Sequence, residues 1–401
     1  MQTYRSLFGI PEFRALFVTQ CLIMAAASLG SLALGTIIYA STGSPVLSAL
    51  AMFGGPLIRL AATWFLASAS DLLRPRQALT VMAAVTAGTD GLQAIPDLAW
   101  GIRFVLLAIP WIVMSATAGS MIALVSDIVP RESFVLARAT INIAVGVMQI
   151  AGYGLGGILL LSLRTSQLFI CAAGVGAVAL LIVRSGVGDH PPRAAGPTIR
   201  RSRTVNRQLL RSPVLRPVLL ALWVPNGLVV GCEAMFVPFA GHRAGYLFSV
   251  TAAGMLLGDI LVGRFLSDRL RDRLLEPLRV LLAAPYLVFL ADPGILIAGL
   301  AGFVASIGYS ASLPLQERLV THTDAAARGQ VLGLSGTGMM AMQGVGAVLA
   351  GLLAQALGAT GHSAATAAGL MAAASLAVTA ALAPGLRYSR PDYQRGVTMG
   401  K

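Results

Sequence analysis

Charged side chains are scarce in this chain of 401 residues. Asp, Glu, Lys and Arg together make up 11% of it and hydrophobic residues make up 56%, whereas a typical soluble domain is about 25% charged. A soluble protein this apolar would have to hide nearly its whole surface, so the natural solvent for the chain is a lipid bilayer. The composition therefore predicts an integral membrane protein.

Lysine is nearly absent, because Lys401 is the only one in the chain. An ATP-binding P-loop needs a lysine followed by serine or threonine after a glycine-rich loop. An ATP-driven pump is therefore excluded within this chain. Energy for any transport must come from an ion gradient or from the substrate itself.

Cysteine and histidine are few and scattered. The three cysteines fall inside apolar segments and the four histidines fall in expected loops, with no ligand-like spacing in either set. Enzyme catalysis would need converging carboxylates, a His/Asp set or an activated nucleophile, and the sequence shows no such cluster. We therefore expect no disulfide, no metal site, no cofactor and no enzymatic activity.

Segments of about 20 apolar residues, the length that crosses a bilayer as a helix, recur along the chain. They predict an all-α integral membrane protein with twelve transmembrane helices. The ninth expected helix is short and contains Pro285, and the first is too long for a cleaved signal peptide. The expected ranges are 15–40, 46–67, 77–96, 99–124, 139–161, 167–184, 217–240, 244–266, 278–291, 294–313, 331–355 and 364–384.

The second half of the chain repeats the first. The pattern S-D-x-L-R-x-R begins at Ser70 and again at Ser267, 197 residues later, and Met148-Gln149 recurs as Met342-Gln343, 194 residues later. Matches in the same order and at nearly the same spacing indicate that an ancestral unit was duplicated, as in many secondary transporters. The expected parts are a six-helix bundle over 1–184, a basic cytoplasmic linker over 185–213, a second, pseudo-symmetric six-helix bundle over 214–386 and a basic tail over 387–401.

The net charge of +13 comes almost entirely from arginine. If both termini are cytoplasmic, 25 of the 29 basic residues lie on the cytoplasmic side, three lie outside and Arg59 lies within the membrane. This asymmetry follows the positive-inside rule, so the basic charge orients the chain and contacts lipid headgroups. We expect a monomer in the inner (cytoplasmic) membrane with both termini in the cytoplasm, and no nucleic-acid partner.

These features resemble the major facilitator superfamily over essentially the whole chain. In that family the loop between the second and third helices typically reads G-x-L-A-D-R-x-G-R-R, and residues 67–76 match it at Asp71 and Arg76. The resemblance implies that this loop and its second copy lock one end-state through charge-assisted contacts that break when the halves rock. The gating-loop candidates are Asp71, Arg74, Arg76, Asp259, Arg264, Asp268, Arg269 and Arg271.

The fifth expected helix contains G-Y-G-L-G-G over residues 152–157. This stretch is similar to the G-P-x-x-G-G signature of antiporters in the superfamily, with tyrosine in place of proline. Glycines at this spacing also fit a close helix–helix contact, which is the favoured interpretation of Gly152, Gly156 and Gly157. The stretches D-I-V-P-R-E over residues 127–132 and N-G-L-V-V-G over residues 226–231 are similar to the branch of the superfamily that exports drugs, macrolides and siderophores.

Two features of other helices bear on the mechanism. Pro225 and Gly227 in the seventh expected helix either form a gating hinge or serve ordinary packing. The arginine that many proton antiporters carry in the fourth helix is missing from residues 108–111, and Arg103 lies nearer the outer end. This departure concerns the coupling mechanism more than the fold.

Ionisable side chains inside the membrane are functional candidates, because burying one without a partner is costly. Glu233 is the first candidate for a proton-coupled or cation-binding carboxylate, since its sequence neighbours are apolar; the alternative is a packing hydrogen bond. Asp90 is a second candidate. Arg59 would attract an anionic substrate or pair with an acid. Gln149 and Gln343, which are mates in the repeat, either bind substrate or join helices.

Asp259 has a competing explanation. With Arg264 and Asp268 it forms a charged stripe toward the cytoplasmic end of the eighth expected helix, and the last two are four residues apart on one helical face. A structural or gating ion pair is favoured over a substrate contact.

The sequence as a whole predicts a secondary active transporter that works by alternating access. We expect it to export an amphipathic small molecule, such as a drug, an antibiotic or a siderophore-like compound, by proton antiport. Its partners would then be the small-molecule substrate, protons and the lipid bilayer. A gradient-driven importer of a small solute and a non-transporting membrane receptor or scaffold are the alternatives.

Overall fold

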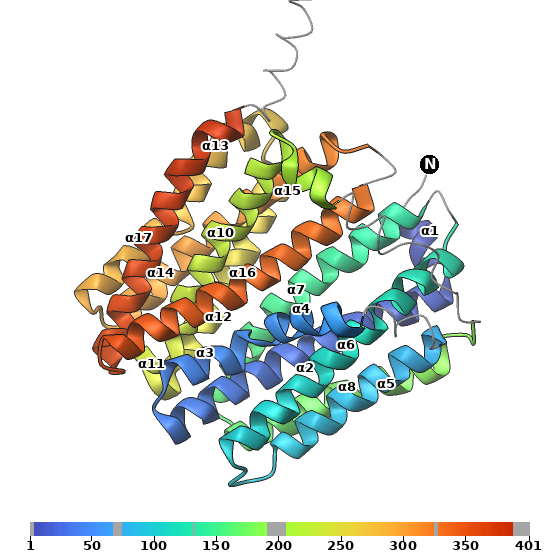
Figure 1. Ribbon diagram of the computed structural model, residues 1–401, viewed down its shortest axis with the longest axis horizontal. Helices are drawn as coiled ribbons and strands as arrows, with labels where there is room; N and C mark the ends of the chain where they lie inside the picture. The colour runs from blue at the N-terminus through green and yellow to red at the C-terminus, as the bar shows by residue number, and fades with distance from the viewer. Residues whose placement is uncertain (1–3, 67–73, 131–132, 191–205, 325–327, 388–401) are drawn as a thin grey trace, which may run out of the picture. The chain divides into compact units, whose positions relative to one another are not determined.

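The computed structural model describes residues 4–66, 74–130, 133–190, 206–324 and 328–387, and the regular structure in these ranges is helical (Figure 1). Eight helices are long and apolar enough to cross a membrane. A ninth span results if α3 (Pro45–Phe53) and α4 (Gly55–Leu66), which meet at a bend of 61°, are counted as one.

This count is lower than twelve, although each expected range coincides with one or two of the helices. One candidate span, Leu215–Phe265, is 51 residues long and contains both the seventh and the eighth expected helices. The third and fourth, α5 (Pro75–Gln93) and α6 (Trp100–Ile128), are not among the eight, and of α6 only Trp100–Ser115 qualifies, as a shorter apolar helix. The chain is an all-helical membrane protein.

The chain divides into two compact units. Unit 1 comprises Met1–Gly43 and Leu50–Thr198, and unit 2 comprises Ser44–Ala49 and Ile199–Lys401. Residues 191–205 of the expected linker and 388–401 of the expected tail lie outside the described ranges. The boundaries at 184, 213 and 386 stay predictions.

Unit 1 is built around the long helix α2 (Pro11–Thr42). It begins with proline at its first position, where a missing N–H costs nothing, and ends at Gly43, whose φ of 63° is left-handed. α2 packs against α7 (Phe134–Leu160) and α8 (Thr165–Gly186), and α5 packs against α6 and α8. The short helix α1 (Tyr4–Phe8) precedes α2 and adds Leu7 to the core.

Unit 2 pairs α10 (Leu215–Ala234) with α16 (Arg328–Ala356) and α17 (Gly361–Leu386). It also pairs α12 (Ala244–Ile260) with α14 (Ile295–Ile307). The remaining elements are α11 (Phe236–Ala240), the 3-10 turn η3 (Gly241–Arg243), the π-helical turn η4 (Leu261–Phe265), α13 (Asp268–Leu281), the 3-10 helix η5 (Ala284–Ala291), the 3-10 turn η6 (Gly308–Ala311) and α15 (Ser312–Thr321).

Glycines bring α2 against α7 in unit 1 and α10 against α16 in unit 2. A Cβ on Gly152 would lie 2.6 Å from the Cβ of Ser28, and one on Gly346 would lie 2.5 Å from the carbonyl carbon of Gly227. Gly152 and Gly346 are mates in the sequence repeat. Each unit therefore contains the same glycine-mediated helix contact, as expected for a duplicated ancestor.

Two expectations about the ninth helix and the segment before it are wrong. The helix begins at Asp268, about ten residues earlier than expected, and continues past Pro285 as the 3-10 helix η5. Arg264 and Asp268 do not share a helical face, because η4 ends at Phe265 and Leu266 is extended (φ −95°, ψ 133°).

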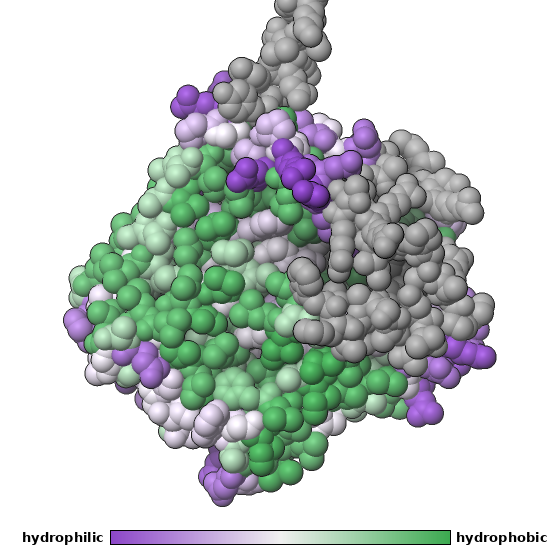
Figure 2. Space-filling model, viewed as in Figure 1, coloured by the Kyte–Doolittle hydropathy of each residue, from purple (hydrophilic) through white to green (hydrophobic). Residues whose placement is uncertain are grey.

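The outer surface of unit 2 is apolar along its helices. Figure 2 shows mainly hydrophobic residues over α17 and its neighbours, with hydrophilic residues gathered near α13 and α15. Side chains such as Leu296, which is 72% exposed on α14, contribute to this surface. An apolar belt with polar helix ends is what a helix bundle presents to lipid.

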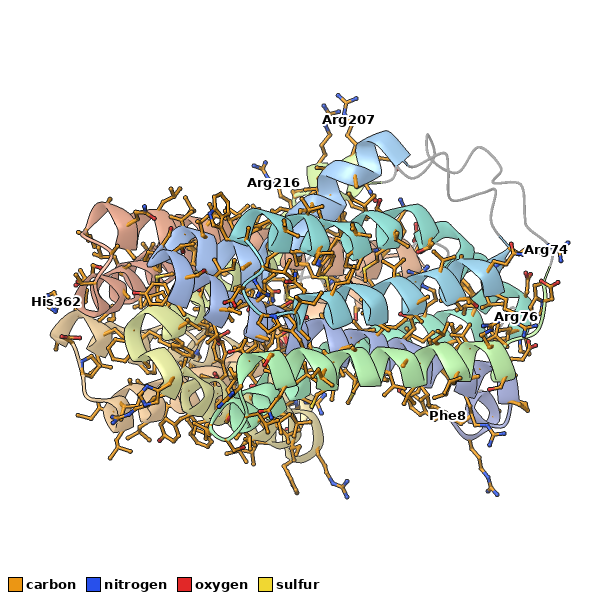
Figure 3. The ribbon with its side chains drawn as sticks, turned by 90° about the horizontal axis from the view of Figure 1, so that it is seen from below. Phe8, Arg74, Arg76, Arg207, Arg216 and His362 are labelled. Atoms are coloured by element: carbon orange, nitrogen blue, oxygen red, sulfur yellow. The ribbon has the colours of Figure 1, made fainter. Side chains whose placement is uncertain are left out.

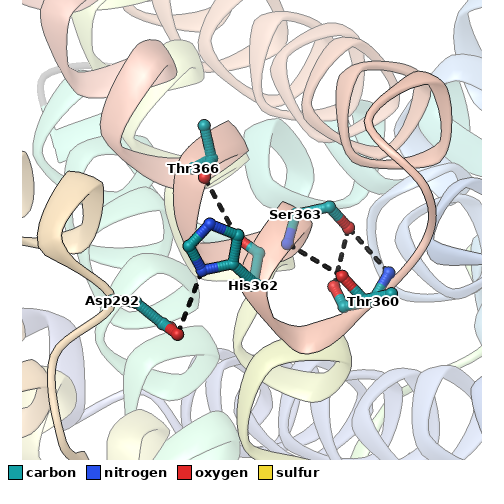
Figure 4. A network of polar contacts seen from close by, with 5 residues as sticks. All are labelled: Asp292, Thr360, His362, Ser363 and Thr366. Carbon is teal, nitrogen blue, oxygen red and sulfur yellow. Dashed lines mark hydrogen bonds and ion pairs between the residues drawn. The ribbon is translucent and has the colours of Figure 1, made fainter.

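A polar network ties the turn after η5 to the start of α17 (Figure 4). The Thr360 hydroxyl accepts a hydrogen bond from the backbone N–H of Ser363 at 3.2 Å, and the Ser363 hydroxyl accepts one from the Thr360 N–H at 2.7 Å. His362 Nδ1 lies 3.1 Å from Asp292 Oδ2. The Thr360 cap contributes about 1 kcal/mol to the stability of α17, and the exposed His362–Asp292 pair adds little to it.

Candidate functional site

The first gating loop is described only from Arg74 onward, and Asp71 lies outside the described residues. Arg74 and Arg76 lie at the end of unit 1 that also carries Phe8 (Figure 3). Arg74 Nη1 lies 2.5 Å from Asp189 Oδ2, and Arg76 Nη2 donates to the carbonyl oxygen of Arg184 at 2.5 Å. Both arginines therefore contact the end of α8 and the residues just after it.

Glu12 binds the same segment from the start of α2. Its Oε1 accepts a hydrogen bond from the backbone N–H of Gly188 at 2.9 Å, and its Oε2 lies 3.0 Å from His190 Nε2. Together with the arginine contacts, these bonds fix residues 184–190 to the base of unit 1. The sequence offered no signal for them, because Glu12 and Gly188 are 176 residues apart.

The second gating loop is the start of α13. Asp268 is the first residue of that helix, and Arg264 and Arg269 are exposed. Arg271 donates to the carbonyl oxygens of Val262 at 3.0 Å and Gly263 at 2.8 Å. It therefore stabilises the π-helical turn η4, whose carbonyls lack regular α-helical partners.

Two buried arginines stabilise the part of unit 2 that lies next to the second gating loop. Arg318, which is 4% exposed, donates to Asp272 Oδ1 at 2.8 Å and to the Leu386 carbonyl oxygen at 3.3 Å. Arg279, which is 2% exposed, lies 2.7 Å from Glu276 Oε2 and donates to the Thr379 carbonyl oxygen. Neither site was predictable from the sequence, in which these arginines stand out only as cytoplasmic charge. They join α13 and α15 to α17.

In unit 1, Asp90 is the acidic residue held inside the helices. Its Oδ2 is buried without a hydrogen-bond partner, and a Cβ on Gly30 of α2 would lie 2.7 Å from its Oδ1. The carboxylate thus lies against the backbone of α2, where only glycine leaves room. Arg59 on α4 and Gln149 on α7 are half-buried.

Arg103 is a structural residue. It is 2% exposed, and its guanidinium donates to the carbonyl oxygens of Gln93 at 2.8 Å, Ile95 at 3.2 Å and Leu98 at 3.2 Å. It therefore closes the turn between α5 and α6. Because all three of its guanidinium nitrogens donate to this turn, we assign Arg103 a structural role there, distinct from the arginine missing from the fourth helix.

The helix that carries Glu233 stays helical through Pro225. The Pro225 carbonyl oxygen accepts a hydrogen bond from the Ser375 hydroxyl of α17 at 3.1 Å. A Cβ on Gly231 would lie 2.7 Å from the carbonyl oxygen of Gly346, one turn beyond the Gly227 contact. These contacts favour packing as the role of Pro225 and Gly227. Gly156 packs similarly against α2, and Gly157 is buried in α7.

Glu233 lies inside unit 2, on α10, and is 8% exposed. Its Oε1 is buried without a hydrogen-bond partner, and no basic side chain pairs with it among the described residues. The hydroxyl of Tyr286, from η5, lies close enough to interact with the carboxylate. Tyr286 belongs to an aromatic cluster, in which the Phe236 ring lies 6.3 Å from that of Tyr286 and 5.2 Å from that of Phe248 between ring centroids.

Asp259 lies near the C-terminal end of α12, and its Oδ1 is also buried without a hydrogen-bond partner. Its electrostatic neighbour is Tyr309 of η6, which also senses Glu233. The sequence singled out both acids as candidates, Glu233 for coupling and Asp259 for an ion pair. It could not identify Tyr286 or Tyr309, because aromatic residues in apolar helices are ordinarily core. Gln343 is half-buried on α16.

No protein-family model and no curated protein matches the chain. Solved structures do match it. A POT family transporter in complex with 5-aminolevulinic acid has a TM-score of 0.68 and 13% identity, with 94% of this chain and 96% of that one covered. For a bacterial homologue of the human lysosomal transporter Spinster, inward-facing and unoccupied, the TM-score is 0.62 at 13% identity, with 97% of each chain covered.

The nucleoside transporter NupG gives a TM-score of 0.62 at 13% identity, with 94% of this chain and 98% of that one covered. Likeness at such low identity shows the fold alone. The chain is a multi-pass membrane protein with the fold of major facilitator transporters, and the matched proteins are transporters, not enzymes.

Proposed function

We propose that this chain is a proton-coupled secondary transporter that exports an amphipathic small molecule by alternating access. The fold supports transport, since it matches transporters over more than 90% of the chain. The observation that carries proton coupling is Glu233, a carboxylate in the interior of unit 2 with no basic partner among the described residues.

An isolated carboxylate in a membrane helix bundle is too costly to persist with its charge. It must be neutralised by a proton or a small cation, and among the described residues no group of three or more Asp, Glu, His or Cys side chains could hold a metal ion. A proton on Glu233 would therefore accompany one state of the transport cycle. Its release would accompany another, which is the requirement for coupling.

The remaining roles are assigned from the positions of the residues. Asp90 is a second acid that would respond to protons in unit 1. Arg59, Gln149 and Gln343, all half-buried, would contact substrate. With so few interior charges, a mainly apolar cavity suits an amphipathic molecule better than a sugar phosphate or an amino acid.

The gating loops and the orientation complete the proposal. Asp71 and Asp268 would latch the cytoplasmic side, and both termini would be cytoplasmic in the inner membrane, as the arginine distribution favours. In unit 2, Arg207 and Arg216 extend away from the helices (Figure 3), where they would reach lipid headgroups.

The test is accumulation of lipophilic dyes and antibiotics in cells that express wild type, Glu233→Gln or Glu317→Gln at equal levels. Glu317 is an exposed acid on α15 and provides the matched control. We expect lower accumulation with wild type and Glu317→Gln than with empty vector, and loss of this effect with a protonophore or with Glu233→Gln.

Two results would contradict the proposal. Accumulation equal to that of empty-vector cells across a broad panel would remove efflux of such compounds. Higher accumulation with wild type, still sensitive to the protonophore, would instead show a gradient-driven importer.

A further inference from the structure

The interior of unit 2 holds a concentration of buried polar atoms without hydrogen-bond partners. Four such atoms are Glu233 Oε1, Tyr286 Oη, Ser306 Oγ and Asp259 Oδ1. They come from four different elements, α10, η5, α14 and α12, all within one unit. Buried polar groups are normally hydrogen-bonded, so such a group of exceptions in one place calls for a physical explanation.

Close helix packing brings these groups together. A Cβ on Gly258 of α12 would lie 2.6 Å from the carbonyl oxygen of Ile307, so α12 and α14 touch beside Asp259. A Cβ on Gly302 of α14 would lie 3.7 Å from the Tyr286 hydroxyl, which therefore lies over α14 one turn before Ser306. The Tyr286 hydroxyl thus lies against α14 inside unit 2, where Gly302 also packs tightly against Thr251 of α12.

The groups form an ordered series. The Tyr286 hydroxyl interacts with both the Glu233 carboxylate and the Ser306 hydroxyl, although none of these completes a hydrogen bond of ordinary geometry. Ser306 and Tyr309 are three residues apart where α14 passes into a 3-10 turn, and that spacing places them on one face. Tyr309 lies within electrostatic range of both Asp259 and Glu233.

We propose that Glu233 and Asp259 are the two ends of one proton relay inside unit 2, with the hydroxyls of Tyr286, Ser306 and Tyr309 between them. This inference rests on the proposed function, in which Glu233 exchanges a proton. Glu233 lies seven residues before the end of α11 and Asp259 fifteen residues after the start of α12. At 1.5 Å per residue their depths differ by about 12 Å, which is too far for one direct transfer.

The chemistry of each step is a proton hop. One carboxyl O–H bond breaks as the next oxygen gains a proton, and that hydroxyl passes its own proton onward. No electron moves, each hydroxyl ends as it began, and only the two carboxyl groups exchange charge. The ends differ in access: Glu233 and Tyr286 are buried, whereas Asp259 and Tyr309 are partly exposed. Protons would therefore enter and leave at the Asp259 end.

The experiment measures proton exchange at Glu233 without any substrate. Purified protein is studied by infrared spectroscopy, and the carboxylic acid C=O band of Glu233 is identified by its loss in Glu233→Gln. Transfer into heavy water shifts the band as the proton is replaced by deuterium. We expect Tyr286→Phe and Asp259→Asn each to slow this shift by about tenfold or more, because a hop across the gap faces a higher barrier.

Tyr246→Phe is the matched control, since Tyr246 packs against Gly299 of α14 and belongs to the same helix as Asp259. It should leave the exchange rate unchanged. Ser306→Ala, which removes a small buried hydroxyl, gives an independent variant if Tyr286→Phe lowers the yield of folded protein.

The outcomes separate the relay from the function it rests on. A Glu233 band that exchanges at the wild-type rate in both Tyr286→Phe and Asp259→Asn would overturn the relay and leave proton coupling at Glu233 intact. Absence of any exchangeable Glu233 band, even at a pH low enough for carboxyl groups to carry protons, would overturn both.

Discussion

Replacing Gly346 by alanine should force α16 away from α10 and destabilise unit 2. The new Cβ would lie 2.5 Å from the carbonyl carbon of Gly227 and 3.2 Å from the backbone nitrogen of Leu228. Both neighbours are backbone atoms, so no side chain can turn aside. Restoring ordinary contact requires a helix shift of about 1 Å in a close-packed interior.

The magnitude follows from two opposing effects. Overpacking of this kind costs about 1–3 kcal/mol, whereas replacing a helical glycine by alanine stabilises the helix by up to about 1 kcal/mol. The net expectation for Gly346→Ala is a loss of roughly 1–2 kcal/mol. Gly336, on the same helix, has no atom within 4 Å of its Cβ position. Gly336→Ala therefore isolates the favourable effect alone.

The assay is the apparent Tm of the purified protein in detergent, for the two variants and wild type under one heating rate. For domains of about 150–250 residues, 1 kcal/mol shifts Tm by about 2–4 °C. We expect Gly346→Ala to lower Tm and Gly336→Ala to leave it equal or raise it. A Gly346→Ala protein at least as stable as Gly336→Ala would refute the glycine contact.

Three further changes test other parts of the molecule. Arg318→Ala should lower the free energy of unfolding by about 3 kcal/mol, because it leaves Asp272 and a buried carbonyl without their partner. Its Tm should fall well below that of the exposed-site control Arg264→Ala. Arg103→Met should lower the free energy of unfolding by at least about 3 kcal/mol, since about 1.5–3 kcal/mol is lost for each of several charged hydrogen bonds, and limited proteolysis between α5 and α6 should accelerate; unchanged cleavage would contradict the role of Arg103 in closing this turn. Asp71→Asn should impair transport at normal expression, whereas loss of folded protein would assign Asp71 a structural role.

Much of the fold was predictable because the membrane makes the sequence signal simple. Every crossing element must be a helix that satisfies its own backbone, so long apolar runs identify the helices. Glu233 and Asp90 stood out for the same reason, as acids within such runs. Gly152 and Gly346, which are mates in the repeat, both lie at matching helix contacts.

The errors and omissions arise from features that periodicity does not encode. The break at Leu266 separates Arg264 from Asp268, yet the surrounding residues read as one continuous helix. Contacts between distant segments were also invisible. Asp272 and Arg318 are 46 residues apart, and Tyr286 comes to Glu233 from a different element of the fold. Such pairings depend on tertiary packing, for which a single sequence holds no direct signal.

Coupling through Glu233 is tested most directly in proteoliposomes that contain wild type, Glu233→Gln or Glu317→Gln. A fluorescent lipophilic dye is added, a pH gradient is imposed across the membrane, and dye movement is followed with and without a protonophore. We predict gradient-driven dye movement for wild type and Glu317→Gln and none for Glu233→Gln. Undiminished gradient-driven movement in Glu233→Gln would contradict proton coupling at this carboxylate.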